Sequence, residues 1–199
     1  MGIAACSGVV EKRLAETYLP SFTQWLTRFD GRTPKGVQLR NEPMILSFDE
    51  LVQYRHLVAM VDGAFDPLHH GHIAYFKAAR ELGAPVLCNV ASDRYVSTKH
   101  RPLLSESQRA TVIDAIRYID YVHIYEIDTE TVLRQLRPKY YVKGSDWRAR
   151  GLPPEQEVIC REHGIGIVYL DTVLDSSSRL LQQYAARDEQ SRQRQQGQQ

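Results

Sequence analysis

From Leu57 onward, short apolar runs rich in β-branched residues alternate with stretches of helical periodicity, and this alternation constrains the fold more than any other sequence feature. Such alternation is typical of parallel strands joined by crossover helices. Each run is short and almost continuously apolar, as expected of strands buried on both faces. We therefore predict an α/β fold with a Rossmann-like, doubly wound parallel sheet. The expected strands are residues 57–62, 86–91, 121–125, 140–143 and 165–170.

The stretches between these runs carry helix signals. Apolar residues recur at helical spacing up to Leu82, and Gly83 follows as a C-cap would, which predicts a helix from residue 69 or 72 to 82. Ser105 and Gln108 form a capping box that begins a second helix. Its expected apolar face consists of Val112, Ala115, Ile116 and Ile119. Further helices are expected at residues 129–136 and 154–163, and from about Ser176 through Leu180, Leu181 and Tyr184.

The two ends of the chain differ from the middle. Residues 9–29 have the pattern of an amphipathic helix broken at Pro20, and residues 31–42 have the composition of a linker. The tail 187–199 is rich in glutamine and arginine and almost lacks apolar side chains, so we expect it to be disordered. The predicted organisation is an N-terminal extension (1–43), one folded domain (44–186) and a disordered tail (187–199).

Composition excludes several classes of protein. The chain has 199 residues, with 25 Lys and Arg against 24 Asp and Glu, a balance that argues against nucleic acid as a partner. No apolar run approaches the about 20 residues of a membrane helix, and the first residues do not resemble a secretory signal. The 3 cysteines are widely spaced, as expected of reduced thiols. We expect a cytoplasmic protein that binds neither nucleic acid nor membrane.

The most informative segment is residues 61–73, VDGAFDPLHHGHI, where the first expected strand gives way to the first expected helix. Ligands bind at this position in parallel sheets. Gly63 lets the backbone approach a phosphate, and Gly71 keeps the helix start uncrowded. His69 and His72 lie one helical turn apart, on one side of the helix. Because a helix N-terminus attracts anions, the segment predicts a phosphate pocket with these imidazoles as donors.

Other interpretations of the histidines compete with this one. A histidine near a helix start is often a cap or a half-buried polar residue, and this interpretation suits His70, whose spacing directs it elsewhere. A zinc site made of His69, His70 and His72 would be a different hypothesis, but it lacks a nearby cysteine or an acidic ligand at metal spacing.

Residues 63–72 resemble the G-x-F-D-x-x-H-x-G-H signature of the cytidylyltransferase-like nucleotidyltransferase superfamily. Further similar motifs follow in the family's order over residues 44–184. They are Ser92-Asp93 with Lys99 and Arg101-Pro102 beyond it, Gln108-Arg109, residues 141–146 (YVKGSD), and Asp175-Ser176-Ser177-Ser178, which resembles the motif that starts the family's closing helix.

Within the superfamily the sequence is most similar to that of the heptose 1-phosphate adenylyltransferases, and residues 45–51 and 142–146 carry this similarity. The glycerol 3-phosphate cytidylyltransferases are the rival, since they share the Asp146-Trp147 pair. Three positions depart from the family pattern: Ser145 and Leu174 stand in place of usual glycines, and Asp171 stands where cytidylyltransferases tend to have arginine.

The resemblance implies a set of site residues and an ion. His69 and His72 would stabilise the transition state, and Lys99, Arg101 and Arg109 would hold the pyrophosphate part or the acceptor phosphate. Mg²⁺ would bridge phosphate oxygens, with Asp66, Asp93 or Asp146 near it. The implied nucleotide-binding residues are Gly63, Ala64, Phe65, Asp66, His69, Gly71, His72, Arg109, Lys143, Gly144, Asp146, Ser176, Ser177 and Ser178. Taken alone, the serines are an ordinary N-cap pattern and the basic residues are typical of a solvated surface.

The expected function is transfer of a nucleotidyl group from a nucleoside triphosphate, preferably ATP, to a phosphorylated sugar such as heptose 1-phosphate, with release of pyrophosphate. The alternatives are a CTP-dependent enzyme acting on glycerol 3-phosphate or another polyol phosphate, a non-catalytic nucleotide-binding module, and a scaffold that acts through the N-terminal extension. A homodimer is also expected, from the resemblance and from the apolar surface of the N-terminal amphipathic stretch and of the region around Tyr118 and Tyr121.

Overall fold

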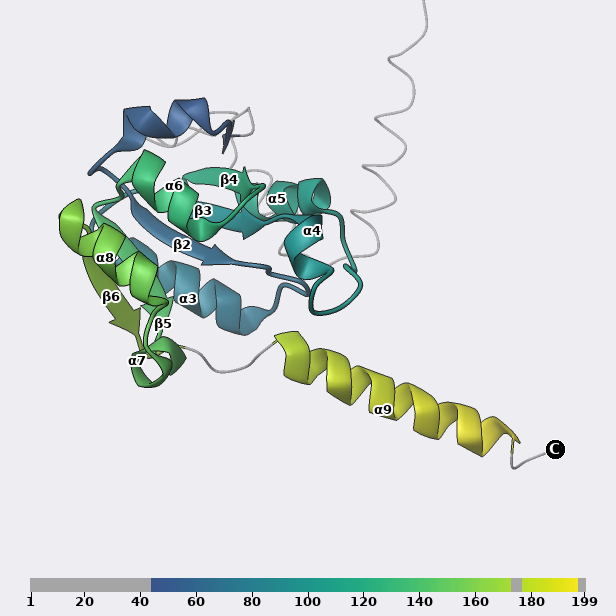
Figure 1. The fold of residues 1–199 in the computed structure, drawn as a ribbon. Coiled ribbons are helices and arrows are strands. Elements are labelled where there is room, and N and C mark those ends of the chain that lie inside the picture. The colour runs from purple at the N-terminus through teal and green to yellow at the C-terminus, as the bar shows by residue number, and fades with distance from the viewer. Residues whose placement is uncertain (1–43, 173–176, 197–199) are drawn as a thin grey trace, which may run out of the picture. The chain divides into compact units, whose positions relative to one another are not determined.

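A single parallel sheet organises the chain. The computed structural model describes residues 44–172 and 177–196, and the N-terminal extension with its linker lies outside them. The sheet has six strands in the order β1-β4-β3-β2-β5-β6, and every pairing is parallel (Figure 1). The predicted Rossmann-like α/β fold is confirmed. The strands are β1 (Ile45–Leu46), β2 (Ala59–Gly63), β3 (Val86–Ala91), β4 (Tyr121–Tyr125), β5 (Tyr140–Gly144) and β6 (Gly166–Leu170).

The helices expected from capping and periodicity lie close to their predicted positions, with small shifts at the ends. The short helices Asp49–Tyr54, Asp93–Val96 and Asp146–Arg150 and the strand Ile45–Leu46 are additional to the prediction. Asp128 caps α6 by accepting a hydrogen bond from the Thr131 N–H, and Ser105 and Gln108 form the expected capping box of α5. The helices are η1 (Asp49–Tyr54, a 3₁₀-helix), α3 (His70–Arg80), α4 (Asp93–Val96), α5 (Glu106–Asp114), α6 (Thr129–Leu136), α7 (Asp146–Arg150), α8 (Pro154–Glu162) and α9 (Ser177–Gln196).

Helices cover both faces of the sheet, and each face carries its own apolar core (Figure 1). Alternate strand residues such as Met60 and Tyr141 belong to the core that includes residues of η1, α6 and α8. Their neighbours Val61 and Val142 belong to the core that includes residues of α3 and α5. The carboxyl ends of the central strands therefore meet at one edge, which is where the expected phosphate segment begins.

The apolar face expected for α5 is wrong in its phase. The helix ends at Asp114, and Val112 is 45% exposed. Its buried residues are Arg109, Ala110 and Ile113. The spacing of Val112 with Ala115 and Ile116 misled the prediction because those two residues follow the helix. Ile119 is buried, but it also lies beyond the last turn.

The C-terminal tail also differs from expectation. Helix α9 continues through residues 187–196, which composition alone predicts to be disordered. Glutamine, arginine and glutamate are good helix formers, so the backbone becomes helical without an apolar stripe to pack. Tyr184, which lies within this helix as expected, is 74% exposed.

The tyrosines expected at a dimer surface take part in the fold of one chain. Tyr121 lies against Tyr54, with ring centroids 4.4 Å apart. Tyr118 packs against the core on the α5 side. The two tyrosines therefore pack within the subunit, whereas the N-terminal stretch that also suggested a homodimer lies outside the described residues. Among the described residues, no helix is long and apolar enough to cross a membrane.

The neighbouring residues Ile113 and Val112 test the phase of α5. We predict that Ile113→Ala lowers the free energy of unfolding by about 2–5 kcal/mol, because it leaves a cavity in the core. Val112→Ala should change it by less than about 0.5 kcal/mol, because Val112 lies at the surface. Urea unfolding of both variants measures the difference, and equal losses would contradict this orientation of the helix.

Candidate functional site

A tight loop connects β2 to α3 and places the first part of the site. Phe65 has a φ of 52° and is 4% exposed. Its ring packs edge-on against the His72 ring, with centroids 5.0 Å apart. A Cβ added to Gly63 would lie 3.0 Å from the Phe65 ring. Gly63 is therefore needed for the packing of this ring, and the loop can turn tightly beneath the start of α3.

The expected imidazoles begin helix α3 by bonding to the backbone. His69 is the N-cap, and its Nδ1 accepts a hydrogen bond from the Gly71 N–H at 3.1 Å. His72 reaches back, and its Nδ1 accepts from the His69 N–H at 3.3 Å. The two rings stack with centroids 3.8 Å apart. His70, for which the sequence favoured a capping role, is instead exposed beyond the cap.

These two bonds determine where each ring carries its proton. A nitrogen that accepts a hydrogen bond has no proton of its own, so each ring carries its proton on Nε2. Burial, together with the charge of His69, lowers the pKa of His72 to about 3. The His72 ring is therefore neutral at pH 7. Both histidines are thus Nε2–H donors at the N-terminus of a helix, as an anion site requires.

A cavity of about 340 Å³ opens beside these histidines. Thirteen of its sixteen lining residues are ones that the sequence singled out, Trp147 among them. They come from the β2–α3 loop and the start of α3, from residue 99, from the end of β5, from α7 and from the start of α9. Asp62, Tyr75 and His100 also line it and were not anticipated. The lining residues are Asp62, Gly63, Ala64, Phe65, Asp66, His69, Gly71, His72, Tyr75, Lys99, His100, Lys143, Gly144, Asp146, Trp147 and Ser177.

A buried ion pair forms the floor of the cavity. The Lys143 ammonium donates to the Asp62 carboxylate at 2.8 Å, and both side chains are less than 10% exposed. Asp62 also accepts from the Tyr141 hydroxyl at 3.0 Å and from Thr129 at 3.3 Å. Burial and the Asp62 charge raise the pKa of Tyr141, which stays protonated. The Trp147 ring lies 4.3 Å from the ammonium, which is therefore held in one place.

Asp66 anchors the loop that brings basic side chains to the cavity. Its carboxylate is 1% exposed and accepts from the Leu103 N–H at 2.8 Å and the Leu104 N–H at 3.3 Å. These bonds hold residues 97–105, so that Lys99 and His100 line the cavity. Arg101, expected to bind a phosphate beside Lys99, is not among the lining residues. The geometry of Asp66 fits loop anchoring better than the metal contact considered for it.

Arg109 performs a different task from the nucleotide contact expected of it. Its side chain is fully buried and does not line the cavity. The guanidinium donates to the Leu104 carbonyl at 3.1 Å, the Ala64 carbonyl at 2.7 Å and the Asp93 carboxylate at 2.7 Å. Arg109 therefore joins the β2–α3 loop to the loop after β3. Asp93, another metal candidate, is its partner.

The remaining predicted residues divide between the cavity and the undescribed part of the chain. The Ser177 hydroxyl donates to the Pro67 carbonyl at 2.9 Å, which brings the start of α9 to the cavity. Ser176 and the side chain of Ser178 lie outside the described residues. Asp146 lines the cavity. Within residues 44–172 and 177–196, no group of three His, Cys, Asp or Glu side chains is arranged to hold a metal ion.

Arg109 provides a test of loop anchoring. We predict that Arg109→Ala lowers the free energy of unfolding by about 3 kcal/mol, because it empties a buried position and leaves carbonyl groups without donors. Arg134 is the matched control, since it pairs with Glu155 at 3.0 Å on the surface. Arg134→Ala should lower the free energy of unfolding by less than about 1 kcal/mol, because an exposed ion pair contributes little to stability. Urea unfolding compares the two, and a small loss in both would show that Arg109 is not an anchor.

His72 predicts a pH dependence of stability. In the unfolded chain its pKa is about 6.5, so lowering the pH protonates the unfolded state before the native state. We therefore predict that the free energy of unfolding falls by about 2 kcal/mol when the pH is lowered from 7.5 to 5, through this residue alone. His72→Asn should remove that part of the pH dependence, whereas the exposed His70→Asn should keep it. Identical profiles in all three proteins would contradict a buried neutral His72.

Comparison with known proteins agrees with the fold. The lipopolysaccharide core biosynthesis protein from Thermoplasma volcanium GSS1 has a similar structure, with a TM-score of 0.51 and 25% sequence identity over 58% of this chain and 97% of that protein. Bifunctional protein HldE of Proteus mirabilis is 32% identical over 161 residues, which are 77% of this chain and 33% of that protein. Bifunctional protein HldE of Magnetococcus marinus is 39% identical over 95 residues, which are 46% of this chain and 20% of that protein.

This chain spans only a fifth to a third of the length of these two curated relatives. A family model described as cytidylyltransferase-like matches residues 60–180, which include the β2–α3 loop, Lys143 and the start of α9. That match covers more than half of the chain. The chain therefore belongs to the cytidylyltransferase-like family.

Proposed function

We propose that this protein transfers a nucleotidyl group from a nucleoside triphosphate, preferably ATP, to a phosphorylated sugar such as heptose 1-phosphate, and releases pyrophosphate. The observation that carries the proposal is the pair of histidines at the start of α3. Both Nδ1 atoms accept backbone hydrogen bonds, so both rings carry their proton on Nε2, and both histidines line the cavity. Such a pair, added to a helix N-terminus, suits a phosphate whose negative charge increases during the reaction.

In this reaction the protein positions the two substrates and stabilises charge, and it forms no covalent bond with either of them. An oxygen of the acceptor phosphate attacks the α-phosphorus of the triphosphate, and the bond to the pyrophosphate oxygen breaks in line with it. His69 and His72 donate hydrogen bonds to the α-phosphate oxygens and the departing oxygen as charge shifts onto them. A pKa of about 3 for His72 means that this ring acts as a neutral donor and not as a cationic acid. No protein nucleophile is required.

Two lysines supply positive charge from opposite parts of the fold. Lys143 comes from β5 and is held by Asp62, whereas Lys99 comes from the loop anchored by Asp66. The Lys99 ammonium lies 4.7 Å from the centre of the Tyr95 ring. Two anionic substrates must approach each other here, so cations on two sides lower the repulsion between them. We assign Lys143 to the nucleotide and Lys99 to the acceptor or the leaving pyrophosphate.

Mg²⁺ fits the proposal as part of the nucleotide substrate. Asp66 and Asp93 are engaged with backbone N–H groups and with Arg109, so neither offers an uncommitted carboxylate. Asp146 lines the cavity and lies 3.9 Å from Arg150. This donor set suits an ion held mainly by phosphate oxygens, as Mg²⁺ usually is. Asp146 would contact the ion or its water molecules.

Support for ATP over CTP comes from the resemblance and from residue 171. The arginine typical of cytidylyltransferases is absent, and Asp171 is exposed at the end of β6. One observation favours the second candidate, a CTP-dependent enzyme acting on a polyol phosphate such as glycerol 3-phosphate. Trp147, shared with those enzymes, lines the cavity against Lys143.

Pyrophosphate release tests the proposal. The full chain is mixed with Mg²⁺, with ATP or CTP, and with heptose 1-phosphate or glycerol 3-phosphate. We predict the fastest release with ATP and the sugar phosphate, by about ten-fold to a hundred-fold over CTP, because a mismatched base leaves buried polar groups unpaired. Faster release with CTP and glycerol 3-phosphate would establish the second candidate. Nucleotide binding without release from any pair would indicate a non-catalytic module.

Variants of the three histidines are the controls. His69→Ala and His72→Ala should each lower turnover by roughly a hundred-fold or more, because each removes a donor to the transition state. His70→Ala should keep the parent rate, since His70 is exposed outside the cavity. Circular dichroism shows whether the folds are retained. Parent turnover in both folded cavity variants would contradict the mechanism.

A further inference from the structure

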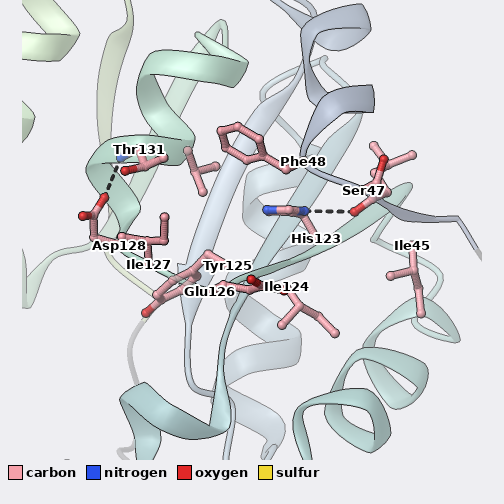
Figure 2. A pocket seen from close by; sticks show the side chains of 12 residues that line it. Ile45, Ser47, Phe48, His123, Ile124, Tyr125, Glu126, Ile127, Asp128 and Thr131 are labelled. Atoms are coloured by element: carbon pink, nitrogen blue, oxygen red, sulfur yellow. Dashed lines mark hydrogen bonds between the residues drawn. The ribbon is translucent and has the colours of Figure 1, made fainter.

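A second and larger cavity lies on the face of the sheet where η1 and α6 pack. Its volume is about 580 Å³, and it shares no residue with the cavity beside the histidines of α3. Figure 2 shows it between strand β4, the segment that follows β1, and the start of α6. Small-molecule sites in proteins usually have volumes of about 300–1,000 Å³. The lining residues are Ile45, Leu46, Ser47, Phe48, His123, Ile124, Tyr125, Glu126, Ile127, Asp128, Thr131 and Val132.

The lining excludes an anionic ligand. It contains no lysine or arginine, and its charged residues are the carboxylates Glu126 and Asp128. Asp128 is already engaged, since it accepts from the Thr131 N–H at 2.6 Å as the cap of α6. Most other lining side chains are apolar, and Phe48 and Ile127 are 40% and 74% exposed. This cavity therefore differs in chemistry from the phosphate site and favours an uncharged, mainly apolar molecule.

One buried polar side chain, that of His123, provides a hydrogen-bond acceptor in the wall of the cavity. His123 is 4% exposed, and its Nδ1 lies 2.9 Å from the Leu46 carbonyl oxygen. A carbonyl can only accept, so Nδ1 carries the proton. Burial lowers the pKa of His123, which keeps the ring neutral. Nε2 is then a bare acceptor, and Figure 2 shows it on the opposite side of the ring from the Leu46 bond, with Phe48 above it and Tyr125 below.

A second polar group lies beside His123. Asn89 on β3 pairs in register with His123 on β4, so both side chains are on the same face of the sheet. Asn89 is fully buried, and neither its amide oxygen nor its amide nitrogen has a hydrogen-bond partner among the described residues. Buried amides are normally satisfied by protein, water or ligand. Asn89 is not itself among the lining residues, so the hydrogen-bonding group that this buried polar pair presents to the cavity is the His123 ring.

We propose that this cavity is a binding site for an uncharged amphipathic small molecule, with an aromatic or branched apolar body and one hydroxyl or N–H donor. The donor bonds to His123 Nε2, and the body packs between Phe48 and Tyr125 toward Ile127. The acceptor is already oriented by the Leu46 carbonyl, so binding requires no reorganisation of the ring. The site is independent of the nucleotidyl transfer proposed above.

Two aromatic probes that differ in one group test the site. 2-Naphthol has a flat apolar body and one hydroxyl donor, whereas 2-methoxynaphthalene has the same body with the donor capped by methyl. Isothermal titration of the full chain should show 2-naphthol binding about ten-fold more tightly, the cost of leaving a buried acceptor unpaired. Equal affinities, or no binding of 2-naphthol, would overturn the proposal.

Variants locate the probe in this cavity. His123→Phe keeps a ring but removes the acceptor, so it should bring the two affinities to within about two-fold of each other. Ile127→Glu places a charge at the exposed rim and should weaken both probes by about ten-fold or more. Leu57→Glu is the matched control, because Leu57 is 56% exposed and lies outside the lining. If His123→Phe does not fold, the comparison of Ile127→Glu with Leu57→Glu still tests the location of the probe. An equal loss of probe affinity in these two variants would show that the probe binds outside this cavity and would contradict the proposal.

Discussion

The two backbone hydrogen bonds that the rings of His69 and His72 accept, from the Gly71 N–H and the His69 N–H, are the interactions on which the site depends. The same bonds satisfy N–H groups at the start of α3 and oblige each ring to carry its proton on Nε2. A cap made of serine or aspartate would begin the helix equally well, but it would supply no N–H donors. The structural requirement of the helix and the chemical requirement of the phosphate site are met by one arrangement, so neither histidine can be exchanged without affecting both.

Around this pair, buried polar side chains connect loops that come from distant parts of the chain. Asp66 binds residues 103 and 104, and Arg109 binds the loop before α3 as well as the loop after β3. Lys143 reaches Asp62 from a strand 81 positions later. Because these bonds form among loops at one edge of the sheet, the cavity is shaped before any substrate arrives, which lowers the cost of ordering it on binding.

The sequence is sufficient for most of the fold and for the residues whose role is local, although strand β1 and the short helices η1, α4 and α7 are not among the predicted elements. Strand β3 and helix α6 were predicted with the bounds that the structure has, and His69 and His72 were recognised by their spacing. The rest depends on contacts distant in sequence. Asp62 ends an apolar run, and nothing near it predicts Lys143 as its partner. Arg109 resembles a surface residue, since arginine is seldom fully buried unless it is paired.

One further consequence follows from the position of Asn89. It pairs in register with His123 on one side and with Asp62 on the other, so polar residues cross three adjacent strands within the buried face of the sheet. Asp62 lines one cavity and His123 lines the other, and the amide between them is a dipole in surroundings of low polarity. The two cavities therefore lie on either side of a single buried amide dipole, which is part of the polar row behind both of them.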